Sequence, residues 1–301
     1  MIKQFEETKR LETRGYFKDL EPPFNKKNST DNDHFIDPYF PPEYKSLIDE
    51  IHNKDLAFAL NEIKPDNIDW KRPRDIFGDK KYNLFEGVIE PCDIIQGNLQ
   101  DCYLLSSLAA LTEFPELIYQ KFITREEKDD GYYEIALFID GEWKTVFIDD
   151  YIPCYKGTIQ PCFAKPHNNE IWVVLIEKAW AKVNGGYSNI ILGEVGDPLK
   201  ALTGYSIESI LNIGKMKTND LWENIKYADD NDYILCTSTM NDDCVHKKGL
   251  IKGHAYSLIS AKEKFHQNQQ FKLLKMFNPW SKGEWNGDWS DNSSYQSSFS
   301  A

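Results

Sequence analysis

The chain has 301 residues, of which 41% are hydrophobic and 14% aromatic, so it is long enough for a sizeable buried core and two domains. It carries 48 acidic and 35 basic side chains, and this formal net charge of −13 argues against nucleic acid as the main partner. Residues 1–14 lack an apolar signal core, and no apolar run is long enough to span a membrane. We therefore expect a cytoplasmic protein without membrane insertion, whose six cysteines are reduced.

We expect residues 1–59 to form an extension in front of the compact protein. It should be partly disordered, because residues 1–30 are polar and interrupted by two adjacent prolines. Apolar residues at helical spacing over 43–53 predict a short helix within it. The first domain is expected over residues 60–192. Its predicted elements are a helix over 102–113, a hairpin of strands 132–138 and 143–148 around Asp140-Gly141, and a helix over 170–183.

The second domain is expected over residues 193–301, and it begins with a glycine-containing stretch at 193–204. Its predicted elements are a helix over 219–228 and strands over 233–239, 255–260 and 271–277. Helix is thus concentrated in the first domain and strand in the second. This segregation is typical of an α+β architecture and not of alternating βαβ units.

Cys102 stands at the start of the predicted helix 102–113, and Gln96 lies six residues before it. A helix N-terminus carries a partial positive charge and free N–H groups. A thiol placed there ionises more easily, and the thiolate is the nucleophilic form. Gln96 offers a side-chain N–H to an oxyanion forming beside that sulfur. These residues predict a cysteine hydrolase, provided that a base and a group that orients the base follow along the chain.

Both groups follow in the predicted strands of the second domain. His254 directly precedes strand 255–260, and Asn278 directly follows strand 271–277. Neighbouring antiparallel strands bring the start of one beside the end of the next, so these two residues are expected to be adjacent. An asparagine carbonyl that accepts from one imidazole nitrogen leaves the other nitrogen facing the thiol. The order Cys, His, Asn at this separation is that of papain-like enzymes.

Each of these residues also has a structural interpretation. A cysteine such as Cys102 is often a small buried hydrophobe, and a histidine beside a strand is often structural. Asn278 precedes a proline and fits a plain turn, while Gln96 fits a polar surface. We expect Trp280 to pack over the His254–Asn278 pair and shield it, although a core tryptophan would have the same sequence context.

The chain resembles the calpain protease core. The likeness runs in order through residues 70–73, 96–105, 146–150, 177–182, 252–257, 278–285 and 289–291, and covers about residues 60–291. The resemblance implies a papain-like fold of two subdomains with the catalytic cleft between them. It also implies a catalytic triad of Cys102 on the first subdomain with His254 and Asn278 on the second. Gln96 would contribute to the oxyanion hole.

By the same resemblance, each subdomain binds one calcium ion. Asp93 and Glu170 would supply carboxylates to the first site, and Glu284 and Asp291 to the second. Oxygen-only ligands suit calcium. Calcium binding would close the cleft and bring the thiol to the imidazole. No organic cofactor is implied, and solvated surface charge is the structural alternative for the four carboxylates.

The chain departs from the family pattern at three places. Tyr103 stands where calpains usually carry a tryptophan after the cysteine, and the basic residue that they often carry shortly before Asp93 is absent. After Asp291 only serine-rich polar residues follow. We therefore expect an incomplete second calcium site and a second subdomain that is truncated at its C-terminus.

The sequence thus predicts a calcium-dependent intracellular cysteine endopeptidase that hydrolyses protein substrates through a thioester acyl-enzyme. The alternative is a catalytically weak or silent calpain-like module that binds or regulates a protein partner. The missing basic residue and the short C-terminal stretch favour that alternative. Selective labelling of Cys102 by a thiol-reactive protease inhibitor distinguishes the two.

Overall fold

A computed structural model of the chain describes residues 30–31, 34–48, 65–210, 213–240, 248–280, 282–290 and 293. The helices are α1 (Tyr44–Leu47), α2 (Pro73–Phe77), α3 (Cys102–Leu111), α4 (Pro115–Tyr119), α5 (Trp172–Val183), α6 (Gly196–Thr203) and α7 (Thr218–Asp230). Short 3-10 turns are η3 (Pro65–Asn67), η4 (Pro91–Asp93), η5 (Tyr187–Ile190) and η6 (Ile213–Lys215). In the described residues no helix is both long and apolar enough to cross a membrane.

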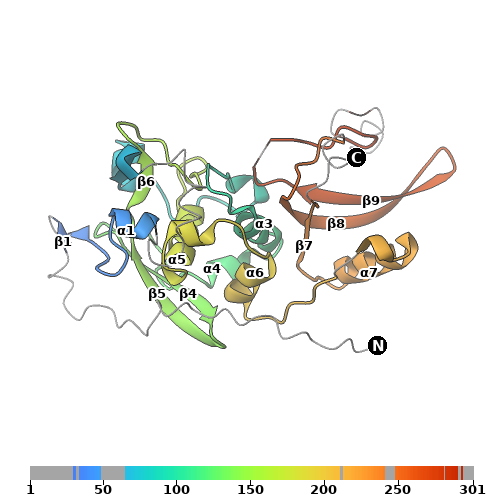
Figure 1. The fold of residues 1–301 in the computed structure, drawn as a ribbon, viewed down its shortest axis with the longest axis horizontal. Coiled ribbons are helices and arrows are strands. Elements are labelled where there is room, and N and C mark those ends of the chain that lie inside the picture. Colours follow the sequence, from blue (N-terminus) through green and yellow to red (C-terminus); the bar gives the residue numbers. More distant parts are fainter. Residues whose placement is uncertain are drawn as a thin grey trace.

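The strands form small antiparallel sheets. They are β1 (Thr30–Asp31), β2 (His34–Phe35), β3 (Ile68–Lys71), β4 (Tyr132–Ile139), β5 (Glu142–Asp149), β6 (Ile152–Tyr155), β7 (Leu235–Ser238), β8 (Ala255–His266) and β9 (Gln269–Phe277). The pairings are β1–β2, β3–β6, β4–β5 and the three-stranded β7–β8–β9. Figure 1 shows two lobes, one with α5 and the β4–β5 hairpin, the other with α7 and the β7–β8–β9 sheet.

The predicted α+β architecture is confirmed, with helix concentrated in the first lobe and the largest sheet in the second. The predicted hairpin is also present, because Asp140 (φ 55°) and Gly141 (φ 86°) both adopt the left-handed conformation that a tight two-residue turn requires. Helix α6 and strands β3 and β6 are among the elements that were not predicted. Helix α6 occupies the stretch assigned to a domain boundary, and strands β3 and β6 pair across more than 80 residues of chain.

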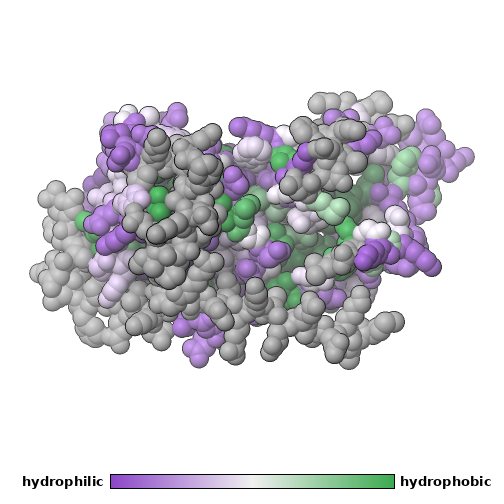
Figure 2. All heavy atoms as spheres, in the orientation of Figure 1, coloured by the Kyte–Doolittle hydropathy of each residue, from purple (hydrophilic) through white to green (hydrophobic). Residues whose placement is uncertain are grey.

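The main hydrophobic core lies in the first lobe. Helix α3 is buried on all sides apart from its first residue, and every side chain of α5 is buried. In the second lobe, β8 begins buried at Ala255 and Tyr256, whereas β9 is largely exposed along its length. Figure 2 shows apolar residues gathered where the two lobes meet, in the region of β7 and β8, with polar residues over the outer ends of the molecule.

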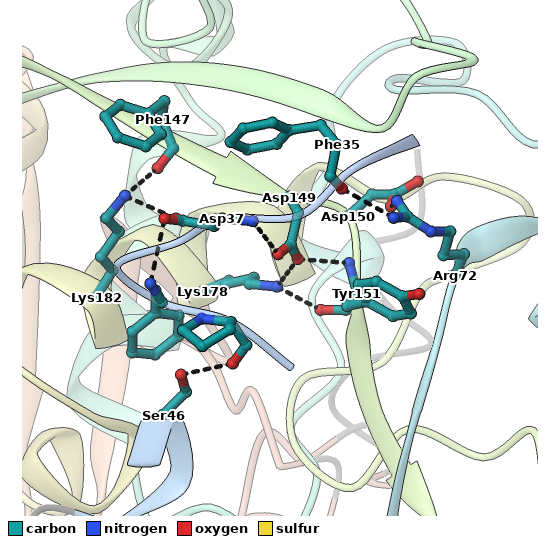
Figure 3. A network of polar contacts seen from close by, with 12 residues as sticks. Phe35, Asp37, Ser46, Arg72, Phe147, Asp149, Asp150, Tyr151, Lys178 and Lys182 are labelled. Atoms are coloured by element: carbon teal, nitrogen blue, oxygen red, sulfur yellow. Dashed lines mark hydrogen bonds and ion pairs between the residues drawn. The ribbon is translucent and has the colours of Figure 1, made fainter. Parts of the chain in front are cut away.

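Residues 34–48, part of the predicted extension, pack into the first lobe. Phe35, Phe40 and Leu47 are buried there. Figure 3 shows the polar contacts that fix this segment, in which Lys182 of α5 binds Asp37 at 2.7 Å and also the Phe147 carbonyl. The predicted helix over 43–53 is present only as α1, and residues 49–53 lie outside the described residues.

The ion pairs in Figure 3 are almost free of solvent. Lys178 binds Asp149, and the Arg72 guanidinium binds Asp150, with all four side chains buried. Asp149 also accepts the backbone N–H of Asp37 at 2.8 Å. The network therefore joins the N-terminal segment, strand β5 and helix α5 into one unit.

Candidate active site

Helix α3 begins at Cys102, the residue predicted as nucleophile. The carbonyl of Asp101 accepts the backbone N–H groups of Leu104 and Leu105, at 2.9 and 3.2 Å, and so closes the first turn. Strand β8 packs against this helix, and the Ser257 hydroxyl donates to the Ser106 carbonyl at 2.7 Å across the contact. The start of α3 therefore lies at the junction of the two lobes.

The Cys102 thiol is half-buried, and burial raises its pKa above the ordinary value. Nearby N–H groups, first that of Ala255, act in the opposite direction and favour the thiolate. Burial of the thiol therefore opposes the effect that we expected from the helix N-terminus. The contact with the Ala255 N–H places the Cys102 sulfur next to the residue that follows His254.

His254 and Asn278 are adjacent, as the strand register predicted. Ser257 of β8 pairs with Phe277 of β9, and His254 Nε2 lies 2.8 Å from Asn278 Oδ1. The amide of Asn278 has a defined orientation, since its Nδ2 donates to the carbonyls of Lys282 and Gly283 at 2.8 and 3.0 Å. Oδ1 must therefore accept, so Nε2 of the imidazole carries the proton and Nδ1 is the basic nitrogen.

Neighbouring groups hold and cover the imidazole. The backbone N–H of His254 donates to the Thr239 hydroxyl at 3.1 Å, and this bond fixes the backbone just before β8. The ring centroids of Tyr256 and Trp280 lie 4.9 and 6.2 Å from that of the imidazole. The backbone N–H of Trp280 donates to Asn278 Oδ1 at 3.1 Å. Burial lowers the pKa of His254, while the hydrogen bond to Asn278 acts in the opposite direction.

Gln96 belongs to the loop before α3 and contacts the second lobe through its backbone. Its N–H donates to the carbonyl of Pro279 at 3.0 Å, next to Asn278. Its side-chain Nε2 donates to the Leu99 carbonyl at 2.8 Å, while Oε1 has no partner among the described residues. An amide nitrogen carries two hydrogens, so one donor is left for an oxyanion.

No hydrogen bond joins the Cys102 sulfur to the His254 imidazole in the part of the chain that the structure describes. Burial raises the pKa of the thiol and lowers that of the imidazole, so it favours the neutral form of both groups. The arrangement has the elements of a nucleophile, a base and an orienting amide.

A buried carboxyl pair, Asp101 and Glu177, lies directly behind the nucleophile and was not predicted from the sequence. The two residues are 0% and 2% exposed, and no Lys or Arg side chain of the described residues pairs with either. Burial raises the pKa of Asp101 to about 7, and burial together with the charge of Asp101 raises the pKa of Glu177 well above its ordinary value. The raised pKa values favour the protonated form of these carboxyl groups, which limits the negative charge next to Cys102.

Tyr103, where the resemblance led us to expect tryptophan, is accommodated by a matched polar contact. Its hydroxyl accepts the indole N–H of Trp180 at 3.0 Å, and both rings are buried. The phenolic oxygen is therefore not left unpaired in the core. The departure at Tyr103 leaves the packing beneath α3 intact.

The structure brings together the first predicted calcium pair, Asp93 and Glu170. Both carboxylates are buried, and burial together with the neighbouring charge of Asp93 raises the pKa of Glu170 to about 8. Two buried like charges at hydrogen-bonding distance form a set of oxygen donors that fits a hard cation. Of the second pair, Glu284 is exposed and Asp291 lies outside the described residues.

Comparison with known proteins gives a consistent result. A family profile described as calpain family cysteine protease matches residues 35–300. The chain is 35% identical over 272 residues to the "Calpain-type cysteine protease DEK1" of Zea mays, covering 86% of this chain and 12% of that protein. It is 34% identical over 268 residues to the "Calpain-1 catalytic subunit" of Bos taurus, covering 86% of this chain and 36% of that protein. The chain thus spans about an eighth to a third of these relatives.

Proposed function

Because the chain belongs to the calpain family of cysteine proteases and has the papain-like α+β core of that family, we propose that it is a calcium-dependent intracellular endopeptidase. Its substrates would be proteins, and its triad Cys102, His254 and Asn278. One observation carries the proposal: the bonded His254–Asn278 pair lies at the lobe junction, where the Cys102 sulfur faces the Ala255 N–H. We assign residues 60–192 and 193–301 to the two catalytic subdomains, with residues 34–48 packed into the first.

In the first step, the Cys102 sulfur attacks the scissile carbonyl carbon, and His254 Nδ1 takes the thiol proton. The imidazolium that forms donates from Nε2 to Asn278 Oδ1, so the amide orients the ring and stabilises its charge. The tetrahedral intermediate collapses when His254 returns the proton to the amine nitrogen and the C–N bond breaks. A thioester remains on Cys102, and water hydrolyses it with His254 again acting as base.

The oxyanion of both tetrahedral intermediates would accept hydrogen bonds from the free Nε2 hydrogen of Gln96 and the backbone N–H of Cys102. The N–H groups in the first turn of α3 have no carbonyl partner within the helix. Donors that are already oriented stabilise developing charge without reorganisation, and one of them is typically worth about 10²–10³ in kcat. Trp280 would keep water away from the His254–Asn278 bond.

Calcium would be held in the first subdomain by Asp93 and Glu170, and in the second by Glu284 and Asp291. The buried pair of like charges at Asp93 and Glu170 supports the first site, because a cation there would relieve their repulsion. When bound, calcium supplies a fixed positive charge that favours one arrangement of the surrounding loops. Hydrolysis of a casein-type substrate should need calcium and stop with a chelator, and equal rates in both conditions would contradict calcium control.

The replacement Cys102→Ala tests the catalytic assignment. Turnover of a casein-type substrate should be abolished, whereas the thermal unfolding midpoint should stay close to that of the parent because only a half-buried sulfur is lost. Cys236→Ser, a change at another half-buried cysteine of the lobe junction, serves as the matched control. Normal turnover by Cys102→Ala would show that the assignment is wrong.

The alternative function is a catalytically weak or silent calpain-like module that binds or regulates a protein partner, and the absence of a hydrogen bond between Cys102 and His254 in the described residues is compatible with it. A thiol-reactive protease inhibitor separates the two functions. A protease should be labelled at Cys102 rapidly and selectively once calcium is present. Slow labelling without preference among the cysteines, with or without calcium, would favour the binding module.

A further inference from the structure

A cluster of metal-binding side chains outside the triad lies on the first lobe. Cys92 and Asp93 belong to the turn η4, and His167 comes from the loop before α5. Their sulfur, carboxylate oxygen and imidazole nitrogen all lie within 4.8 Å of one another. We propose that these three residues form a binding site for Zn²⁺ or a related borderline-soft divalent metal, and that this site shares Asp93 with the proposed calcium site.

The distances suit a tetrahedral metal. Asp93 Oδ1 lies 3.1 Å from His167 Nδ1 and 4.0 Å from Cys92 Sγ. With zinc–ligand bonds of about 2.0–2.3 Å, tetrahedral geometry separates neighbouring ligand atoms by about 3.3–3.6 Å. The two observed separations lie on either side of that interval. All three ligand atoms lie within 4.8 Å of one another, close to the spacing that one shared ion requires.

Burial and charge around the cluster also favour a cation. Asp93 is buried and its Oδ2 accepts the backbone N–H of Glu90 at 2.7 Å, so the shared ligand is held in place. Cys92 is exposed and His167 is partly exposed, so a metal can reach them from solvent. The Cys92 thiol faces the Glu90 carboxylate at 3.6 Å, and Glu170 lies beside Asp93.

The donor set separates this metal from calcium. A thiolate and an imidazole are typical zinc ligands, whereas calcium takes oxygen ligands only. Glu170 and Asp93 together suit calcium, while Cys92, Asp93 and His167 together suit zinc. Because one carboxylate serves both sets, the two ions compete. This competition rests on the proposed calcium site, but the zinc site itself does not depend on it.

The test uses Co²⁺ as a spectroscopic probe in the Cys102→Ala protein, which removes the catalytic thiol as a rival ligand. One equivalent of Co²⁺ should bind and give a thiolate-to-cobalt charge-transfer absorption. Cys92→Ser should abolish that absorption and weaken binding at least about tenfold, and His167→Ala should weaken binding to a similar extent. Cys236→Ser, which changes a cysteine outside the cluster, should leave both the absorption and the affinity unchanged.

Two results would overturn the inference. Absence of the absorption from the Cys102→Ala protein, or its persistence after Cys92→Ser, would show that no such metal site exists. Saturating calcium should displace the bound Co²⁺, and a Co²⁺ spectrum that calcium leaves unaltered would overturn the sharing of Asp93. Since every readout is metal binding by a protein without Cys102, failure here is distinguishable from failure of the proposed protease function.

Discussion

At the scale of single residues, the amide of Asn278 decides which imidazole nitrogen is the base. Its Nδ2 is engaged by two backbone carbonyls, so its oxygen faces His254 Nε2 and the lone pair of Nδ1 stays available. The sequence predicted this pairing from the strand ends alone. It did not predict the two carbonyls that orient the amide, because they come from the turn after Pro279, where no periodic pattern exists.

Replacing Asn278 by alanine should lower kcat/KM about 10²-fold, since the ring loses the group that sets its tautomer and orientation. The hydrogen bond to Asn278 raises the pKa of His254, so its loss should lower that pKa further than burial already does. On acidification, the variant should therefore lose activity at a lower pH than the parent. Steady-state kinetics from pH 5 to 9 measures both effects. Asn231→Ala, at the exposed residue that directly follows α7, is the control, and an unchanged kcat/KM for Asn278→Ala would contradict the role.

The carboxyl pair behind Cys102 leads to a prediction about stability and pH. The pKa values of Asp101 and Glu177 are raised in the folded protein, so the folded state binds more protons than the unfolded state between about pH 4 and pH 7. The free energy of unfolding therefore falls as the pH rises through that interval. The slope is at most about 1.4 kcal/mol per pH unit for each extra proton bound by the folded state.

Glu177→Gln should remove part of that cost, because the glutamine amide donates a hydrogen bond to Asp101 without a charge of its own. Denaturant unfolding of parent and variant from pH 5 to 8 should show the variant gaining relative stability as the pH rises. Glu126→Gln, at an exposed position, should follow the parent throughout. Parallel curves for the parent and Glu177→Gln would show that the pair binds no extra proton in the folded state.

At the scale of elements, the loop before α3 is positioned by close backbone approach. A Cβ at Gly97 would lie 1.9 Å from the Phe163 carbonyl oxygen and 2.6 Å from that of Cys162. The neighbouring Asn98 N–H donates to the same Cys162 carbonyl at 2.8 Å. Only glycine fits at this position without moving backbone atoms. The conformation of the loop that carries Gln96 therefore depends on Gly97.

Gly97→Ala should destabilise the fold by about 1–3 kcal/mol, because backbone atoms must move to make room. Activity should fall further than the loss of folded protein explains, since Gln96 moves with the loop. Gly214→Ala, where nothing lies near the added carbon, is the matched control. Thermal unfolding and single-turnover rates measured on both variants decide the matter, and a Gly97→Ala protein that behaves like Gly214→Ala would contradict the steric argument.

Several elements could be predicted because their signals are local. The turn at Asp140-Gly141 and the helices α3 and α5 each depend on neighbouring residues. Helix α6 was missed because its glycine indicated a break, although Gly204 ends it in the left-handed conformation. The pairing of β3 with β6 was missed because neither four-residue strand carries a pattern that identifies a distant partner.

At the scale of the whole molecule, buried charge connects the N-terminal segment to the catalytic lobe. Lys182 and Asp37 are both buried, with side chains 3% and 0% exposed, so each needs the other to offset its desolvation. Asp37 lies in the part of the chain that the sequence analysis assigned to an extension outside the core. Its contacts show that residues 34–48 belong to the first lobe.

Asp37→Ala should destabilise the protein by about 3–5 kcal/mol, because the buried Lys182 ammonium loses its paired carboxylate and keeps the Phe147 carbonyl as its hydrogen-bond acceptor. The comparison is Lys45→Ala, which removes a solvent-exposed pair with Glu43 and should change stability by less than about 1 kcal/mol. Urea unfolding at neutral pH measures both. Equal effects of the two changes would show that the buried network does not hold the segment in place.

The sequence by itself determined the α+β class and the family, and it predicted the residues proposed as nucleophile, base and orienting amide, because helix and strand periodicity and short motifs are carried by residues close together in the chain. Only the tertiary structure decided the burial of Cys102 and of the Asp101–Glu177 pair, which raises their pKa values, and the gathering of Cys92, Asp93 and His167. Burial and the distances between groups far apart in the chain set these properties. Both arise only when the chain folds, because neither is fixed by the identity of adjacent residues.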